Sequence, residues 1–317
     1  MSIGKAPWSR PLPAPNEPPG RQLSSTKPGR VLSKEPTKKP WRGKPEGKGG
    51  DRGRFFKRSG PPQDRPQNRD VPRSEDGPLR LFGLHSVEAA LKNPARKVNR
   101  LVLTENAERR LVESMGKLSH TVEYASPRDL DKILGADAVH QGAMLETEPL
   151  PEPDFQDLIV ASGGRPLIVL DQVTDPHNVG AILRSAVVFG AAGLVMTRRH
   201  SPPLNGVLAK SASGALELVP VALVGNLSHA LRELKDVGFQ LVGLDGDAEA
   251  AIEDMDWSRP TALVMGAEGK GLRQLTAETC DLLVRISTDG AVGSLNVSNA
   301  AAIALHTAAC SRRKTKA

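Results

Sequence analysis

Short, nearly uninterrupted apolar runs recur through the second half of the chain. They are PLIVL before Asp171, GLVM before Thr197, QLVGL before Asp245, TALVM before Gly266 and LLVRI ending at Ile286. Strands that are buried on both faces have this pattern. Because segments with helical spacing separate the runs, the pattern predicts a mainly parallel sheet flanked by helices over 166–312.

A smaller alternation of helical and strand patterns precedes this region, over 79–148. Helical apolar spacing is found in three segments: Leu81 to Leu91, Ala107 to Leu118, and a helix opened by Ser126-Pro127. Strand patterns lie at Val98 to Thr104, Val122 to Tyr124 and Gly142 to Glu146. The segment is predicted to be a small α/β domain. Residues 149–165, rich in Pro and Glu and ending in Ser162-Gly163-Gly164, are predicted to be a polar linker.

Composition sets residues 1–78 apart from the remainder. This segment holds 18 Lys+Arg against 8 Asp+Glu, which leaves 25 against 28 after it, so the net charge of +7 divides into +10 and −3. It also holds 15 of the 26 prolines but only six Ile, Leu or Val. Such a segment buries too little apolar surface to offset its chain entropy, and we expect a disordered basic tail.

Basic residues alternate with isolated aromatics in two stretches of this tail, Lys38 to Lys48 and Asp51 to Arg58. The alternation is typical of an arm that follows a phosphate backbone. A solvated tail that only aids solubility and a mitochondrial-type transit peptide remain open alternatives. The many prolines and eight acidic residues argue against the amphipathic helix that a transit peptide needs.

The chain shows no apolar run long enough for a membrane span and no signal-peptide core after Met1. Cys280 and Cys310 have no metal-ligand spacing and lie in apolar contexts. We therefore expect a cytoplasmic protein without membrane association, with both thiols reduced and no bound metal.

Ligands of open α/β sheets bind beyond the carboxyl ends of the strands, and three loops there are candidates. The first is DQVTDPHNVGAILR, Asp171 to Arg184. It places Asn178 in a turn and Arg184 about two turns into the following helix. A structural alternative is that Asp175 or Asn178 caps the helix and Arg184 is merely exposed.

The second loop, GAEGKG over Gly266 to Gly271, carries one acid, Glu268, among glycines. Glycines let a backbone approach a ligand closely. The pattern is neither the dinucleotide fingerprint nor a Walker-type phosphate loop, because Lys270 is followed by glycine. A helix N-terminus with a tight turn is the local alternative.

The third loop is DGAVGSLNVSN, Asp289 to Asn299, which leads into an apolar helix. Its first turns hold four residues that are poor in helix interiors: Ser294, Asn296, Ser298 and Asn299. An N-cap explains one of these residues but not all four, so we expect the others to face a ligand.

Together the three loops resemble the signature motifs of the SpoU (TrmH-like) branch of the SPOUT RNA 2′-O-ribose methyltransferases. The matching segments are DPHNVGAILR, VMGAEGKGL and VGSLNVSNA, in the same order and spacing, within Pro166 to about Ser311. Gly83 to Glu148, with GLHSVEAAL and His140-Gln141-Gly142, resembles the L30e-like RNA-substrate-binding domain of the large-subunit rRNA methyltransferases.

The resemblance implies a trefoil-knotted catalytic domain that binds S-adenosylmethionine and acts as a homodimer on RNA, with the RNA cleft shared between subunits. It implies methylation of a ribose 2′-oxygen, with a guanosine of 23S rRNA as the family expectation. The implied catalytic residues are Arg184, Asn178, Glu268, Ser294 and Asn296. The implied cofactor-binding residues are Gly243, Leu244, Gly266, Ile286 and Leu295.

One position departs from the family pattern, since Ser287-Thr288 stands where Pro-Met is usual. We expect altered packing there and retained activity. Three rival functions remain. A tRNA ribose methyltransferase has the same chemistry, although the extra N-terminal domain favours rRNA. A non-catalytic RNA-binding assembly factor would not need all five catalytic residues. A Rossmann-type nucleotide enzyme would need a fingerprint after the first strand, and Asp171 to Gly180 has none.

Overall fold

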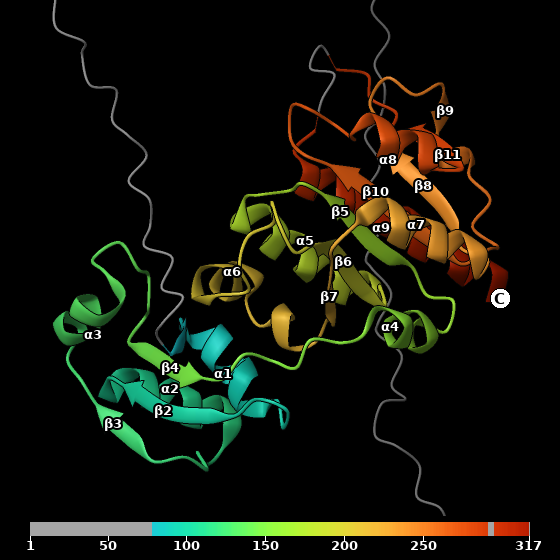
Figure 1. Ribbon diagram of the computed structural model, residues 1–317. Coiled ribbons are helices and arrows are strands. Elements are labelled where there is room, and N and C mark those ends of the chain that lie inside the picture. Colours follow the sequence, from blue (N-terminus) through green and yellow to red (C-terminus); the bar gives the residue numbers. More distant parts are fainter. Residues whose placement is uncertain (1–77, 291–294, 317) are drawn as a thin grey trace, which may run out of the picture. The chain divides into compact units, whose positions relative to one another are not determined.

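The computed structural model describes residues 78–290 and 295–316, all of which belong to one compact unit (Figure 1). The predictions for the basic tail, including the two basic and aromatic stretches, and for Ser294 therefore lie outside the described residues. Within the described part, two separate sheets are present.

The first sheet has the order β1-β4-β2-β3 and carries three helices. Its strands are β1 (Leu79–Phe82), β2 (Val98–Leu103), β3 (Val122–Tyr124) and β4 (Ala143–Thr147). Its helices are α1 (Leu84–Lys92), α2 (Glu105–Met115) and α3 (Pro127–Leu134). β4 is antiparallel to β1 and β2, and β2 is parallel to β3. Thr104 caps α2 and Ser126 caps α3 through their side chains, as expected for hydroxyl residues at helix starts.

The second sheet has seven strands, all parallel, in the order β7-β6-β5-β10-β8-β11-β9. The strands are β5 (Leu167–Asp171), β6 (Gly193–Thr197), β7 (Val221–Val224), β8 (Gln240–Leu244), β9 (Ala250–Ala251), β10 (Thr261–Gly266) and β11 (Leu282–Arg285). The helices are α4 (Phe155–Ser162), α5 (Pro176–Phe189), α6 (Gly206–Ala212), α7 (Leu227–Asp236), α8 (Gln274–Thr279) and α9 (Val297–Lys316), with 3₁₀ turns η1 (Ala215–Glu217) and η2 (Ile252–Asp254).

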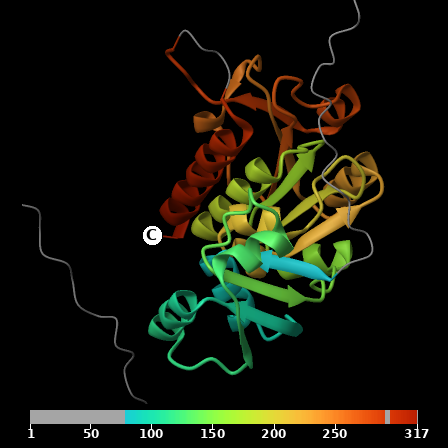
Figure 2. The ribbon, with the colours of Figure 1, turned by 90° about the vertical axis from the view of Figure 1, so that its left-hand side faces the viewer.

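Both faces of this sheet are covered, because alternate residues of each central strand point to opposite sides. In β5, Ile168 and Leu170 join the core formed with α5, α6 and α9, whereas Leu167 and Val169 join the core formed with α4 and α7. Figure 2 shows α9, in red, lying against α5, and these two helices are in contact. The prediction of a mainly parallel sheet flanked by helices, preceded by a small α/β region, is confirmed. The trefoil knot stays a prediction.

The structure differs from the sequence-based elements in four places. Leu81 and Phe82 belong to β1 and not to the helix that follows, because Gly83 at φ 88° separates the two elements. Strands β7 and β9 were missed, and both are short and lie near or at sheet edges. The segment predicted as a linker contains α4, whose Leu158 and Ile159 are buried against the second sheet.

One apolar core joins the two sheets. It includes Leu84 and Val87 of α1 together with Leu208 of α6 and Leu216 of η1. The small sheet region is therefore packed on the same helices that cover one face of the large sheet. Among the described residues, no helix is both long and apolar enough to cross a membrane.

Candidate active site

Side chains from the three candidate loops meet at the carboxyl edge of the large sheet. The Nδ2 amide of Asn296 donates to Oδ1 of Asn178 over 3.0 Å and lies 3.3 Å from Oε2 of Glu268. The Nδ2 amide of Asn178 donates to the same Glu268 oxygen over 3.3 Å. These three residues, which we call the amide–carboxylate cluster, form a closed triangle of hydrogen bonds. The predicted convergence of the loops is confirmed for these three residues.

Asn178 is presented by the first turn of α5. Asp175 caps this helix by accepting a hydrogen bond from the backbone N–H of His177 over 2.8 Å, and Pro176 occupies the first helical position. The cap is therefore Asp175, which leaves the Asn178 side chain for the cluster. Asn178 is only 9% exposed, and a buried amide of this kind needs partners.

Asn296 lies immediately before α9. Its Oδ1 accepts from the backbone N–H of Ser298 over 2.9 Å and from the Ser298 hydroxyl over 2.6 Å. The Oδ1 atom of Asn296 thus caps α9 and its Nδ2 atom donates to the cluster, and together these bonds fix the orientation of the amide. Ser298 supports Asn296 and does not face the cluster. Ser294, the remaining predicted catalytic residue of this loop, lies outside the described residues.

The loop that carries Glu268 closes on itself. Ala267 and Gly271 form a bridge, and the Gly271 N–H donates to the Ala267 carbonyl over 2.9 Å. A Cβ on Gly266 would overlap the backbone of Gly271 and Leu272, so only glycine fits at this position. The close neighbour of this position is the loop's own backbone, and the expectation that the glycine lets a ligand approach stays a prediction.

An ion pair between a buried aspartate and a half-exposed arginine, which was not predicted from the sequence, anchors the same loop to the sheet. Asp171 at the end of β5 has a fully buried side chain, and the Nε of Arg273 donates to its Oδ1 over 2.7 Å. The Arg273 backbone N–H donates to the other carboxylate oxygen over 3.2 Å. The sequence signal was an acid at the end of an apolar run and, 102 residues later, an arginine two positions after the last glycine of the GAEGKG loop. The pair holds the Glu268 loop beside the start of α5.

Arg184 lies apart from the cluster, although it shares α5 with Asn178. Six residues at about 100° each place the two side chains about 120° apart around the helix. Arg184 is exposed and has no hydrogen-bond or ion-pair partner within 78–290 and 295–316. The structure therefore does not bring Arg184 to the amide–carboxylate cluster within one chain.

Three of the five predicted cofactor-binding residues lie at strand ends, one lies before α9 and one lies inside β8. Leu244 and Gly266 end the neighbouring strands β8 and β10, and Ile286 directly follows β11, the other neighbour of β8. Leu295 precedes α9 and is 42% exposed. Parallel strands end at one edge, so Leu244, Gly266 and Ile286 line it side by side.

Gly243 lies one residue inside β8, and its missing Cβ is replaced by packing with Leu272 and Leu283. Cys280 is the third neighbour of this position. Burial, together with the adjacent Asp281 carboxylate, raises the pKa of the Cys280 thiol to about 12. The thiol is therefore neutral and belongs to the packing under β8. Both cysteines are free.

The departure at Ser287-Thr288 produces a polar contact. The Ser287 hydroxyl donates to Oε2 of Glu253 in η2 over 3.1 Å, and both Ser287 and Thr288 are exposed. The contact ties the chain after β11 to the η2 turn. A proline at position 287 would lack this hydroxyl and could not make the contact, and the expectation of altered packing with retained activity stays a prediction.

Comparison with known proteins gives two family matches. Residues 165–306 match the SpoU rRNA methylase family, and residues 80–153 match the RNA 2′-O ribose methyltransferase substrate-binding family. The chain is 39% identical over 234 residues to the 23S rRNA (guanosine-2′-O-)-methyltransferase RlmB of Pseudomonas aeruginosa, which covers 71% of this chain and 94% of the relative. It is 40% identical over 233 residues to the protein of that name from Vibrio cholerae, with the same coverage of both chains.

Solved structures show the same architecture. The SpoU methyltransferase AviRb from Streptomyces viridochromogenes, in complex with the cofactor AdoMet, aligns with a TM-score of 0.63 and 26% identity over 76% of this chain and 92% of that one. With the three loop motifs, the parallel sheet and these relatives in agreement, the chain belongs to the SpoU rRNA methylase family.

Proposed function

We propose that this protein is an S-adenosylmethionine-dependent methyltransferase that modifies the ribose 2′-oxygen of a guanosine in 23S rRNA. The observation that carries the proposal is the amide–carboxylate cluster, in which three separate loops place Asn178, Glu268 and Asn296 in mutual hydrogen bonds at the carboxyl edge of the sheet. The proposed substrate rests on the relatives, which are named as 23S rRNA guanosine 2′-O-methyltransferases.

The strand ends fit the proposed cofactor. Leu244 and Ile286 are half-buried and Leu295 is exposed, so apolar side chains are left partly uncovered at the strand ends. Such a surface suits a ligand with an adenine ring and polar substituents. When bound, S-adenosylmethionine supplies an electrophilic methyl group on a positively charged sulfur.

The residues of the cluster have separable tasks. The 2′-hydroxyl must lose its proton as its oxygen attacks, so a group that holds the oxygen and a group that receives the proton are needed. Glu268 uses Oε2 to accept both amide bonds, whereas Oε1 has no hydrogen-bond partner among the residues that the structure describes. We assign Oε1 to accept the proton through water or to hold the Arg184 of a second copy of the chain, and the two amides to fix the carboxylate.

Arg184 is assigned to the phosphate next to the target ribose and to the developing negative charge on the 2′-oxygen. A guanidinium keeps its proton in proteins, so it serves as a fixed positive charge and not as a base. Because Arg184 is exposed and turned away from its own chain's cluster, RNA that contacts it extends beyond that cluster.

A homodimer accounts for this placement. Val187 and Val188 follow Arg184 by three and four residues, so the three share one face of α5. Val187 is 39% and Val188 70% exposed, and Ile303 on the neighbouring α9 is 37% exposed. We propose that a second copy covers this apolar face, which puts Arg184 at the boundary between two subunits and makes the RNA cleft a shared one.

We also propose a cytoplasmic location, where 23S rRNA is available, and we propose that the basic tail strengthens RNA binding. The support for the tail is its net charge of +10 beside a remainder of −3, since phosphate attraction depends on basic side chains.

The test is methyl transfer in vitro from labelled S-adenosylmethionine to 23S rRNA transcript, with mapping of the modified ribose, and with tRNA as the second substrate. We expect one 2′-O-methylated guanosine in 23S rRNA and none in tRNA. Arg184→Ala should abolish transfer and leave cofactor affinity within about twofold, because its side chain is exposed away from the strand ends. Absence of transfer to either RNA by the parent protein, or full activity of the arginine variant, contradicts the respective assignment.

A further inference from the structure

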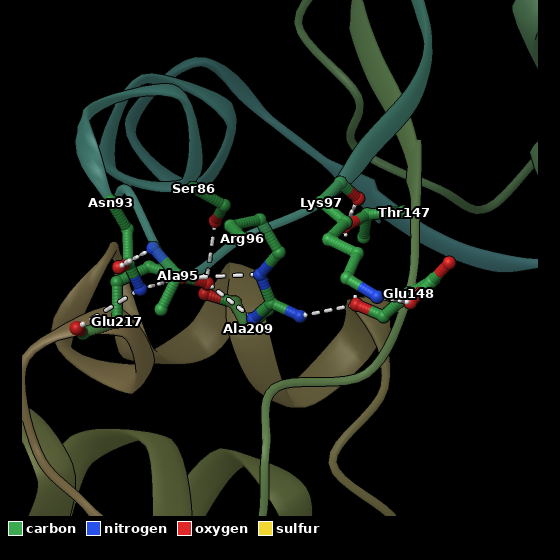
Figure 3. Close-up of polar contacts among 9 residues, drawn as sticks. All are labelled: Ser86, Asn93, Ala95, Arg96, Lys97, Thr147, Glu148, Ala209 and Glu217. Carbon is green, nitrogen blue, oxygen red and sulfur yellow. Dashed lines mark hydrogen bonds and ion pairs between the residues drawn. The ribbon is translucent and has the colours of Figure 1, made fainter.

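The 3₁₀ turn η1 is joined to the small sheet region by a buried ion pair (Figure 3). The Nη2 of Arg96, in the loop between α1 and β2, donates to Oε1 of Glu217 over 2.6 Å, and its Nε lies 3.2 Å from Oε2. Both side chains are 2% exposed. A charge pair so completely removed from water has a large desolvation cost and persists only where its geometry is well satisfied.

The remaining polar atoms of this pair are also satisfied. The Arg96 Nη1 donates to the Glu148 carbonyl over 2.9 Å, and Asn93 donates to Oε2 of Glu217 over 2.8 Å (Figure 3). Close by, the buried hydroxyl of Ser86 donates to the Ala209 carbonyl of α6 over 2.9 Å. The Arg96–Glu148 bond joins the small sheet region to the segment that follows β4. The other bonds join the small sheet region to η1 or to α6.

Helix α6 makes a second polar contact with the small region. The Lys210 Nζ donates to Oε1 of Gln141 over 2.6 Å, and the same oxygen accepts from the Leu84 backbone N–H over 3.3 Å. Gln141 adopts φ 56°, a conformation that costs energy for a residue with a side chain. Partial burial lowers the pKa of the Lys210 ammonium. The contact is therefore maintained against both backbone strain and desolvation.

The next residue of α6 faces the catalytic loop. The Ser211 hydroxyl donates to the His177 carbonyl over 3.2 Å, directly before Asn178. A Cβ on Gly180 would lie 2.5 Å from the Ser211 Cβ, so α5 and α6 pack closely at a position where only glycine fits. Consecutive residues of one short helix thus touch the small region on one side and the first catalytic loop on the other.

We propose that α6 and η1 hold the small sheet region in a fixed position relative to the amide–carboxylate cluster. RNA that is bound to the small sheet region then places one ribose at the site. In this proposal, which rests on the proposed function, Arg96, Glu217, Lys210 and Gln141 are positioning residues. Without their contacts the small sheet region would be held by the apolar core that it shares with α6 and η1 and by the segment between β4 and α4. That attachment is less specific in orientation, which lowers the fraction of bound RNA that is positioned correctly.

The main test removes both charges of the buried pair together, because removal of one would leave the other unpaired and could prevent folding. Arg96→Met with Glu217→Met should fold and bind S-adenosylmethionine at one site per chain with unchanged affinity. We expect kcat on 23S rRNA to fall about tenfold, with KM changed less than about threefold. The reason is that bound RNA is positioned less well, while the binding of RNA is retained. The matched control is Arg100→Met with Glu123→Met, an exposed pair of the small sheet, which should keep parental kcat.

A milder pair of variants tests the Lys210 contact. Gln141→Met removes the acceptor and should lower kcat in the same manner. Gln141→Glu keeps an oxygen acceptor for Lys210 and for the Leu84 N–H, and should keep parental kcat. General destabilisation would reduce the number of cofactor sites as well as kcat, so the site count separates the two causes. Parental kcat in both the double-methionine and Gln141→Met variants overturns the positioning role. An inactive parent overturns the proposed function instead.

Discussion

The side-chain amide of Asn296 donates to the side-chain carbonyl of Asn178 over 3.0 Å, although 118 residues separate the two. Asn296 is simultaneously the cap of α9 and Asn178 belongs to the first turn of α5. The bond therefore ties the starts of two packed helices to each other and to Glu268. Loss of any member removes one hydrogen bond from each of the other two.

Asn178→Ala should be the most informative substitution in the cluster. It removes one acceptor from Asn296 and one donor from Glu268 in a nearly buried position, so we expect unfolding to become easier by about 1–3 kcal/mol. Methyl transfer should fall about a hundredfold or more, because the carboxylate loses its fixed orientation. Denaturant unfolding and single-turnover methylation measure the two effects. Asn99→Ala, at an exposed position of β2, should change neither, and parental turnover in the cluster variant would refute its role.

Gly180→Ala should destabilise the protein, although alanine is the better helix former by about 1 kcal/mol. The added Cβ would lie 2.5 Å from the Ser211 Cβ and 2.8 Å from the Ala212 nitrogen, so α6 must move away from α5. We expect a net loss of about 1–3 kcal/mol, measured by thermal unfolding. A gain in stability would show that this helix crossing is not tightly packed. Ser185→Ala, on the same helix, is the control and should be near neutral.

Val188→Asp tests the proposed subunit interface. The side chain is 70% exposed in the single chain, so a charge there costs little unless another surface covers it. We expect the variant to sediment as a monomer at concentrations where the parent is a dimer, and to lose methyl transfer while still binding the cofactor. Val160→Asp, on α4 and 81% exposed, is the matched control and should remain dimeric. A parent that is monomeric would remove the interface proposal altogether.

Cys280 should resist thiol reagents in the folded protein. With its pKa raised to about 12 by burial, only on the order of 10⁻⁴ of the thiol is ionised at pH 8, and the thiolate is the reactive form. Of the two cysteines in the chain, Cys310 should therefore react first, and Cys280 should react only as the protein unfolds. Mass spectrometry of peptides after timed labelling checks the order. Equal labelling rates under native conditions would contradict the burial of Cys280.

Removal of residues 1–75 should weaken binding to 23S rRNA and reduce the dependence of binding on salt. Each phosphate contact that is lost lowers the slope of log affinity against log salt by somewhat less than one. Methyl transfer at saturating RNA should persist, because the catalytic residues are retained. Filter binding at several salt concentrations gives the slope, and an identical slope for both proteins would show that the tail does not contact RNA.

Much of this protein was readable from local patterns. The apolar runs located five of the seven strands of the large sheet, because a strand buried on both faces has an almost unbroken apolar sequence. Asp175 was one of the two candidate caps of α5, with Asn178 as the other, and the three polar loops supplied Asn178, Glu268 and Asn296. Helix caps and buried strands are determined by residues that are close together along the chain, so they can be predicted from the sequence.

Other features depended on which segments meet in space. The placement of β10 between β5 and β8 brings the Glu268 loop to α5, and that order is a property of chain topology. Only the packed structure showed that the missing Cβ of Gly266 makes room for its own loop. It also showed that Arg184 is exposed while Asn178 is nearly buried, and that Arg96 and Glu217 are buried together. Such contacts join residues that are distant along the chain, and their energies depend on burial and on complementary geometry, which local sequence does not record.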